Sequence, residues 1–306
     1  KKKAFTLIEL LVVVAIIALL ISILLPSLSR ARELSKRLVC ASNVKGMGTA
    51  FKIYANDYEE HWPTVPFQTP SGNAFVTWWG NDGRVGDPVG VGNAAVPGRE
   101  LQSLETSTTL SVTRNLWMLV RSGDVTPKSY LCPSSGDSQA NEQNVDLFYD
   151  FRGYTNVSYG YQVPYGPFST RASEDIDPRM AVAADKSPYG SGSKGNVPAD
   201  DNTWSILEGF QTPQDWRQFN SGNHGGTGSG EGQNVLFGDG HASFEKTPDV
   251  GIDQDNIYTG MAPFQANTLD ITNRASGLKP NQGEIRYPGF QAIGTSDASS
   301  DALIYP

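Results

Sequence analysis

The chain has 306 residues, with 24 Lys and Arg against 32 Asp and Glu, and a net charge of −8. Residues 1–60 hold nine basic and five acidic side chains, a net charge of +4, so the remainder carries −12. This acidic body argues against nucleic acid as a partner, since phosphate contacts need a basic surface. The length suggests about two domains. The 32 Gly and 19 Pro indicate a loop-rich body that is mainly β.

The first predicted element is an apolar helix over residues 5–25. Its 21 residues include one charged side chain, Glu9. At about 1.5 Å per residue the helix is roughly 31 Å long, which matches the roughly 30 Å hydrocarbon core of a bilayer. A carboxylate inside such a segment usually faces a partner. The alternative is that Glu9 extends to the lipid headgroups.

Residues 1–10, KKKAFTLIEL, resemble the leader junction of type IV pilins and type II secretion pseudopilins. In that family a prepilin peptidase cuts after a small residue, and the new amino terminus is methylated. The resemblance implies cleavage after Ala4, methylation of Phe5, and pairing of Glu9 with the amino terminus of a neighbouring subunit. It further implies a subunit of a helical filament made of copies of itself. Such a subunit is stored in the inner membrane and then displayed at the cell surface or in the periplasm.

A proline follows the apolar run. Pro26 is predicted to kink the helix or melt it locally; the alternative is that it ends a transmembrane helix. Apolar residues at spacings of three and four from Leu28 to Tyr58 favour a helix that resumes and packs one face on the body. The predicted organisation is a leader remnant at 1–4, a helix at 5–60 with 5–25 in the membrane, and a head domain at 61–306.

The head is predicted to be a loop-rich, mainly antiparallel β domain, so the fold class is α+β. A helix is expected at 113–122, ended by Gly123 as its C-cap. A short strand or turn is expected at 130–133, and strands at 157–163 and 180–184. The clearest hairpin joins 234–237 to 241–244 through Asp239 and Gly240. Residues after 249 are expected to be irregular.

Two cysteines, Cys40 and Cys132, are present. Outside the cytoplasm an even pair predicts a disulfide. This disulfide would link the long helix to the head and close a loop of about 90 residues. Closing such a loop would stabilise the folded chain by about 4 kcal/mol. The alternative is two buried free thiols.

A second resemblance involves His224 and the Asp239-Gly240 pair. This stretch is similar to the C-terminal H-x-DG signature of a family of large pilin-like proteins, with a longer spacing that suggests an inserted loop. The same resemblance includes three companion features: Cys40-x-x-Asn43, Tyr54-x-x-x-Tyr58 followed by Pro63, and Cys132-Pro133-Ser134.

Three side chains near the hairpin form a candidate metal site. His224, Asp239 and His241 offer imidazole and carboxylate ligands that suit zinc and similar ions. The alternative is a hairpin turn whose Asp and Gly satisfy the backbone conformation, with His224 hydrogen-bonded to the loop and no metal.

A second candidate metal site is the oxygen-rich loop that contains Asp249, Asp253 and Asp255. Calcium takes six to eight oxygen ligands, and the pseudopilin resemblance implies calcium in a C-terminal loop. The EF-hand spacing is absent, so a solvated loop is the alternative. No other cofactor is predicted.

No catalytic arrangement of side chains stands out, so we predict that the protein is not an enzyme. The competing hypothesis for its function is a membrane-anchored or tip-located minor subunit whose head binds a glycan, a surface or a secreted protein. Eight aromatic side chains could form a glycan-binding face or pack the core: Phe148, Tyr149, Phe151, Tyr154, Tyr159, Tyr161, Tyr165 and Phe168. A metal-dependent enzyme built on His224, Asp239 and His241 is the third and weakest hypothesis.

Overall fold

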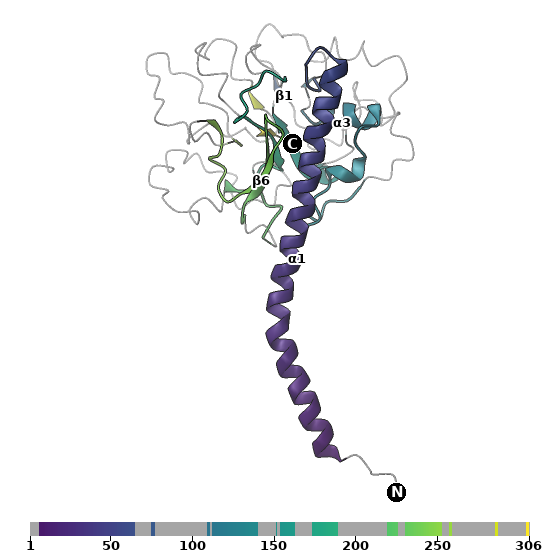
Figure 1. Ribbon diagram of the computed structural model, residues 1–306, viewed down its shortest axis with the longest axis vertical. Helices are drawn as coiled ribbons and strands as arrows, with labels where there is room; N and C mark the ends of the chain where they lie inside the picture. The colour runs from purple at the N-terminus through teal and green to yellow at the C-terminus, as the bar shows by residue number, and fades with distance from the viewer. Residues whose placement is uncertain are drawn as a thin grey trace.

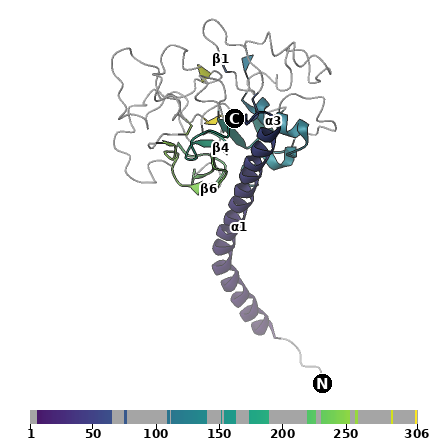
Figure 2. The same cartoon turned by 45° about the horizontal axis from the view of Figure 1, so that its top comes forward.

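The computed structural model is an α+β arrangement, as predicted, in which one long helix, α1 (Leu7–Asp57), extends from a head that contains the β-sheets (Figure 1). The N-terminal half of α1 projects away from the head and its C-terminal half lies against it, as both views show (Figure 2). The structure describes residues 6–64, 75–76, 109–110, 112–139, 151, 154–162, 173–188, 219–225, 230–252, 257–258, 285–286 and 304–305.

A capping box starts α1. The Thr6 hydroxyl accepts a hydrogen bond from the Glu9 backbone, and the Glu9 carboxylate accepts one from the Thr6 backbone at 2.8 Å. These bonds satisfy two of the N–H groups that a helix start leaves unpaired. The helix then passes through Pro26 without interruption, so the predicted local melting is not seen. Figure 1 shows that the projecting half is curved rather than straight.

The C-terminal half of α1 packs one face on the head. Its buried residues recur at the spacing of a helix face: Cys40, Val44, Met47, Gly48, Ala50, Phe51, Tyr54 and Ala55. The predicted apolar stripe began too early, however, because Leu28, Leu34 and Leu38 are exposed. Apolar spacing identifies a face, but the position of the head decides which part of that face is covered.

The main sheet has five antiparallel strands in the order β6-β5-β4-β3-β8. Its strands are β3 (Tyr159–Gln162), β4 (Ala181–Asp185), β5 (Gln233–Phe237), β6 (Ala242–Glu245) and β8 (Ile304–Tyr305). A second, three-stranded sheet has the order β2-β1-β7. Its strands are β1 (Phe75–Val76), β2 (Thr109–Leu110) and β7 (Ile285–Arg286), with β1 parallel to β2 and antiparallel to β7.

Several predicted elements of the head are confirmed. Helix α3 (Thr113–Ser122) ends at Gly123, whose φ of 88° is the left-handed C-cap conformation. The hairpin of β5 and β6 forms where it was predicted. No strand forms at 130–133: Tyr130 ends a 3₁₀ helix, η1 (Pro127–Tyr130), which proline starts, and a turn begins at Pro133. A second short 3₁₀ helix is η3 (Tyr154–Asn156).

The strand predicted at 157–163 is confirmed as β3, which is buried throughout and pairs with β4 and β8. The prediction that residues after 249 are irregular needs correction, because β8 pairs with β3 and β7 pairs with β1. Pairings between such distant segments leave no periodic signal in two-residue strands.

Gly48 is expected to be essential for the close approach of α1 to β5. A Cβ atom at Gly48 would lie 2.7 Å from Cδ1 of Leu236, which is itself buried. Replacing Gly48 with alanine should therefore lower the free energy of unfolding by about 1–3 kcal/mol, the usual effect of overpacking. Denaturant unfolding of the full chain in detergent measures the change.

Gly46 provides the matched control, because it lies one half-turn away in the same helix. A Cβ atom there meets nothing within 4 Å, so Gly46→Ala should raise stability by up to about 1 kcal/mol through helix propensity alone. Equal effects of the two substitutions would contradict the proposed packing constraint at Gly48.

Candidate assembly helix and its junction with the head

The projecting half of α1 exposes a continuous apolar surface. Its large apolar side chains from Leu7 to Leu28 are 47–78 % exposed. The helix is long and apolar enough to cross a membrane, and none of the apolar part is buried within the chain. An apolar helix without a packed face needs a lipid environment or neighbouring helices.

Glu9 is the carboxylate of this apolar surface, and the structure places it in the first turn of α1. Its Oε2 atom accepts hydrogen bonds from both the backbone N–H and the hydroxyl of Thr6, each at 2.8 Å. In the single chain, Glu9 is therefore satisfied by its own helix start. Ala4 and Phe5, the predicted cleavage and methylation residues, lie outside the described residues.

The junction between α1 and the head begins at Glu33, about seven turns further along. Its carboxylate accepts hydrogen bonds from the Ser134 hydroxyl at 3.0 Å and lies 3.1 Å from Nδ1 of His224. One turn later, Arg37 pairs with Glu231 and lies 4.4 Å from the centre of the Phe244 ring. Polar contacts thus hold the helix to the head before its apolar face becomes buried.

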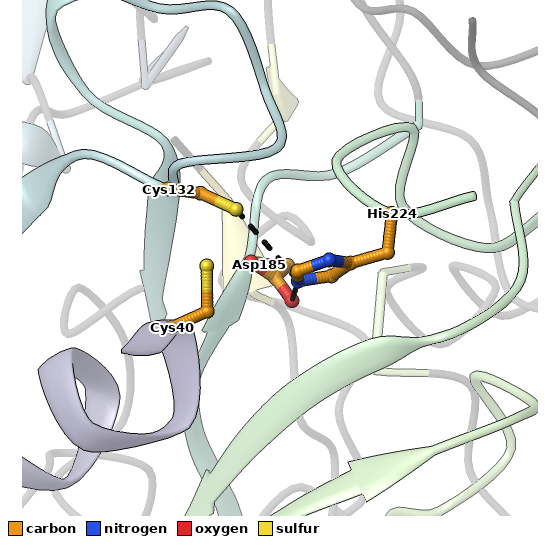
Figure 3. A group of neighbouring side chains, drawn as sticks. All are labelled: Cys40, Cys132, Asp185 and His224. Carbon is orange, nitrogen blue, oxygen red and sulfur yellow. Dashed lines mark hydrogen bonds and ion pairs between the residues drawn. The ribbon is translucent and has the colours of Figure 1, made fainter. Parts of the chain in front are cut away.

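Four buried side chains converge beside this junction (Figure 3). Cys40 comes from α1, Cys132 from the segment after η1, Asp185 from the end of β4 and His224 from the loop before β5. Their ligand atoms all lie within 4.8 Å of one another. Within the described part of the chain, this is the group of such residues that could hold a metal ion.

The two cysteines are free thiols in the structure, which differs from the predicted disulfide. The prediction was right about proximity, since the sulfur atoms of Cys40 and Cys132 belong to the same 4.8 Å cluster. Burial raises the pKa of the Cys132 thiol, and its hydrogen bond with Cys40 raises it further. The Cys132 thiol is therefore protonated unless a cation displaces its proton.

His224 has a carboxylate on each side of its ring. Nδ1 lies 3.1 Å from Oε1 of Glu33, and Nε2 lies 3.2 Å from Oδ2 of Asp185 and 3.7 Å from the Cys132 sulfur. Burial lowers the pKa of His224, but the charge of Asp185 and its hydrogen bond outweigh burial and raise that pKa to about 11. Partial burial raises the pKa of Glu33, whereas the hydrogen bonds from His224 and Ser134 bring it below its ordinary value.

Asp185 is the member of the cluster that the sequence did not reveal. Its Oδ2 accepts a 2.6 Å hydrogen bond from the Asn234 backbone, and its Oδ1 accepts one of 2.9 Å from the Asn223 side chain. The Asn234 side chain also lies 3.1 Å from Nε2 of His224. The one available signal was an acid that ends a fully apolar strand, which indicates a buried carboxylate with a partner. Glu33 carries no such signal, because it lies among other charged residues of the helix.

The predicted site of His224, Asp239 and His241 is not assembled. His224 is fully buried in the junction, whereas Asp239 and His241 lie exposed in the turn between β5 and β6. There, Asp239 accepts hydrogen bonds from the His241 backbone at 2.9 Å and ring at 2.5 Å, and the backbone bond lowers the Asp239 pKa. The histidine ring stacks on Phe237. The turn chemistry accounts for both residues, which was the alternative interpretation.

Two other predicted sites are only partly described. Asp253 and Asp255 of the candidate calcium loop lie outside the described residues, and Asp249 alone does not form a site. Of the aromatic residues considered for glycan binding, Phe151, Tyr159 and Tyr161 are buried in the core. Tyr154 is placed only in its backbone, as part of η3, and Phe148, Tyr149, Tyr165 and Phe168 lie outside the described residues.

Comparison with known proteins bears on the N-terminal segment. No curated protein and no solved structure matches the chain. Residues 1–25 match the family described as the prokaryotic N-terminal methylation motif; the match does not reach the H-x-DG stretch, which stays a prediction. The motif and the apolar helix are consistent with a membrane-anchored precursor that a prepilin peptidase processes. Together they support a type IV pilin-like protein.

Proposed function

We propose that the chain is a structural subunit of a type IV pilus-like or pseudopilus-like surface filament, without catalytic activity. The observation that carries this proposal is an apolar helix with an uncovered surface and a single carboxylate, most of which lies within the methylation motif at residues 1–25. The head is bound to the opposite half of the same helix. The apolar half is therefore free to associate with copies of itself.

The apolar half of α1 requires surroundings without water both before and after assembly. Leaving a large aliphatic side chain in water instead of burying it costs about 1.5–3 kcal/mol, and the exposed residues from Leu7 to Leu28 include 16 such side chains. Transfer from lipid to a helix bundle keeps these side chains out of water in both states. The same helix is therefore suited first to a membrane and then to a filament core.

Glu9 provides specificity in this proposal. In an apolar environment its carboxylate requires a partner of opposite charge or a set of hydrogen bonds. Thr6 supplies hydrogen bonds within the single chain. In the filament, the methylated amine of Phe5 from a neighbouring subunit supplies the positive charge and fixes the register between adjacent helices.

Electron microscopy of sheared surface material, combined with intact-mass analysis, tests the proposal. We expect filaments in which this chain is the abundant component and begins at Phe5 with one added methyl group. A mature chain that keeps residues 1–4, or surface material without filaments of this chain, would contradict it. A processed chain that is present only in trace amounts at filament ends would instead favour the tip-located subunit.

A further inference from the structure

We propose that Cys40, Cys132, Asp185 and His224 bind one zinc ion, which joins the assembly helix to the head. The four residues come from α1 and from three separate segments of the head (Figure 3). A metal bound here would therefore fix the position of α1 relative to the main sheet of the head. This is a structural site, distinct from the assembly surface at the other end of α1.

The donor set favours zinc. Two thiolates, one imidazole and one carboxylate are ligands that Zn²⁺ accepts, and thiolate ligands disfavour the hard ions Ca²⁺ and Mg²⁺. All four side chains are buried, and each offers one ligand atom. Four protein ligands with no position left for water are characteristic of structural rather than catalytic zinc.

The distances are close to those of a tetrahedral site. With Zn–S bonds of about 2.3 Å and Zn–N or Zn–O bonds of about 2.0–2.2 Å, neighbouring ligand atoms are separated by about 3.3–3.8 Å. Nε2 of His224 lies 3.2 Å from Asp185 and 3.7 Å from the Cys132 sulfur. The largest separation in the group is within 4.8 Å, so binding requires side-chain adjustments of about 1 Å or less at its widest edge.

The residues around the cluster orient its ligands. Glu33 lies 3.1 Å from Nδ1 of His224, so it can accept a hydrogen bond from the Nδ1–H group, which leaves Nε2 directed at the metal. This carboxylate–histidine arrangement is the usual support of a zinc-bound imidazole. Asn223 and the Asn234 backbone hold the two oxygens of Asp185. Zinc binding releases the protons of the two thiols and of Nε2 to solvent, with no change of oxidation state.

A zinc site and a disulfide between Cys40 and Cys132 exclude each other, since a disulfide leaves no thiolate to bind the metal. Both would connect α1 to the head. The metal uses Asp185 and His224 as well, whereas the disulfide gives these two residues no role. The convergence of all four ligand atoms therefore favours the metal.

The first test is metal content. The full chain is purified in detergent without chelator or reductant, and zinc is measured by mass spectrometry together with the titre of free thiols. We expect one zinc per chain and two thiols that react only after chelation and denaturation. Replacement by Co²⁺ should produce the intense visible absorption of a tetrahedral ion and the near-ultraviolet thiolate-to-cobalt band. A Cys40–Cys132 disulfide, or a reduced chain that binds neither ion, would overturn the proposal.

Variants then identify the ligands. Cys132→Ser and Asp185→Asn should each abolish stoichiometric zinc binding, and Cys132→Ser should remove intensity from the thiolate band. Glu33→Gln should weaken zinc affinity by about 10–100-fold, because it acts only through His224. His241→Gln replaces an exposed histidine and should leave one zinc per chain. Zinc lost in His241→Gln, or kept in the ligand variants, would overturn the assignment. Where a ligand variant does not fold, the wild-type cobalt spectrum still decides between thiolate ligation and its absence.

Discussion

A chain with Glu9→Gln is expected to insert into the membrane as the wild type does and to form no filaments. Glutamine occupies the same position in a capping box as glutamate, so the hydrogen bonds to Thr6 that start α1 are retained. The substitution removes only the negative charge. If that charge pairs with the amino terminus of a neighbouring subunit, assembly fails although the helix and its apolar surface are intact. Membrane fractionation and electron microscopy of sheared material measure the two outcomes separately.

Thr6→Ala is the matched control for this prediction. It removes the hydroxyl that bonds to Glu9, but it keeps the carboxylate. The expected cost is the usual effect of losing an N-cap, about 1 kcal/mol in the stability of the first helical turn, with filaments still formed. Normal filaments from Glu9→Gln would show that hydrogen bonding to Thr6, and not charge pairing, is the function of Glu9.

The second large effect is expected at Lys186, which follows the proposed zinc ligand Asp185 in the sequence. Its Nζ lies 3.0 Å from Oδ2 of Asp137, and both side chains are only 6 % exposed. Lys186→Met leaves Asp137 as an uncompensated buried charge, which costs about 3–5 kcal/mol. For a domain of this size that corresponds to a melting temperature about 6–20 °C lower. Thermal unfolding of the full chain in detergent, followed by near-ultraviolet circular dichroism, measures the shift.

Two controls separate this cost from a general effect of removing charges. Arg179 forms a 2.9 Å ion pair with Asp177 at the surface, where its side chain is 71 % exposed, so Arg179→Met should cost less than about 1 kcal/mol. A double variant, Lys186→Met with Asp137→Leu, removes both buried charges and should recover most of the lost stability. The double variant also removes the hydrogen bond that the Ser158 hydroxyl donates to Asp137, but Ser158 keeps Ser135 as a hydrogen-bond partner. A double variant as unstable as the sum of both single variants would contradict the charge explanation.

The amino-acid sequence determined the long helix without help from the rest of the molecule. Continuous apolar residues and a capping Thr6 specify a helix start through short-range interactions. The spacing of three and four between apolar residues after Pro26 likewise predicted one packed face. Only the tertiary structure decided where that face becomes buried, because the head covers it from Cys40 onward and leaves Leu28 and Leu38 exposed.

The hairpin of β5 and β6, helix α3 and its C-cap at Gly123 were also predictable, since turn and cap residues act within a few positions of the chain. The partners of His224 were not. The predicted ligands, Asp239 and His241, are close in sequence, but the hairpin directs them to the surface. Cys40, Cys132 and Asp185 meet His224 because α1, η1, β4 and the loop before β5 converge in three dimensions. Contacts between segments so far apart depend on how α1 and the sheet pack together, so the spacing of residues along the chain does not predict them.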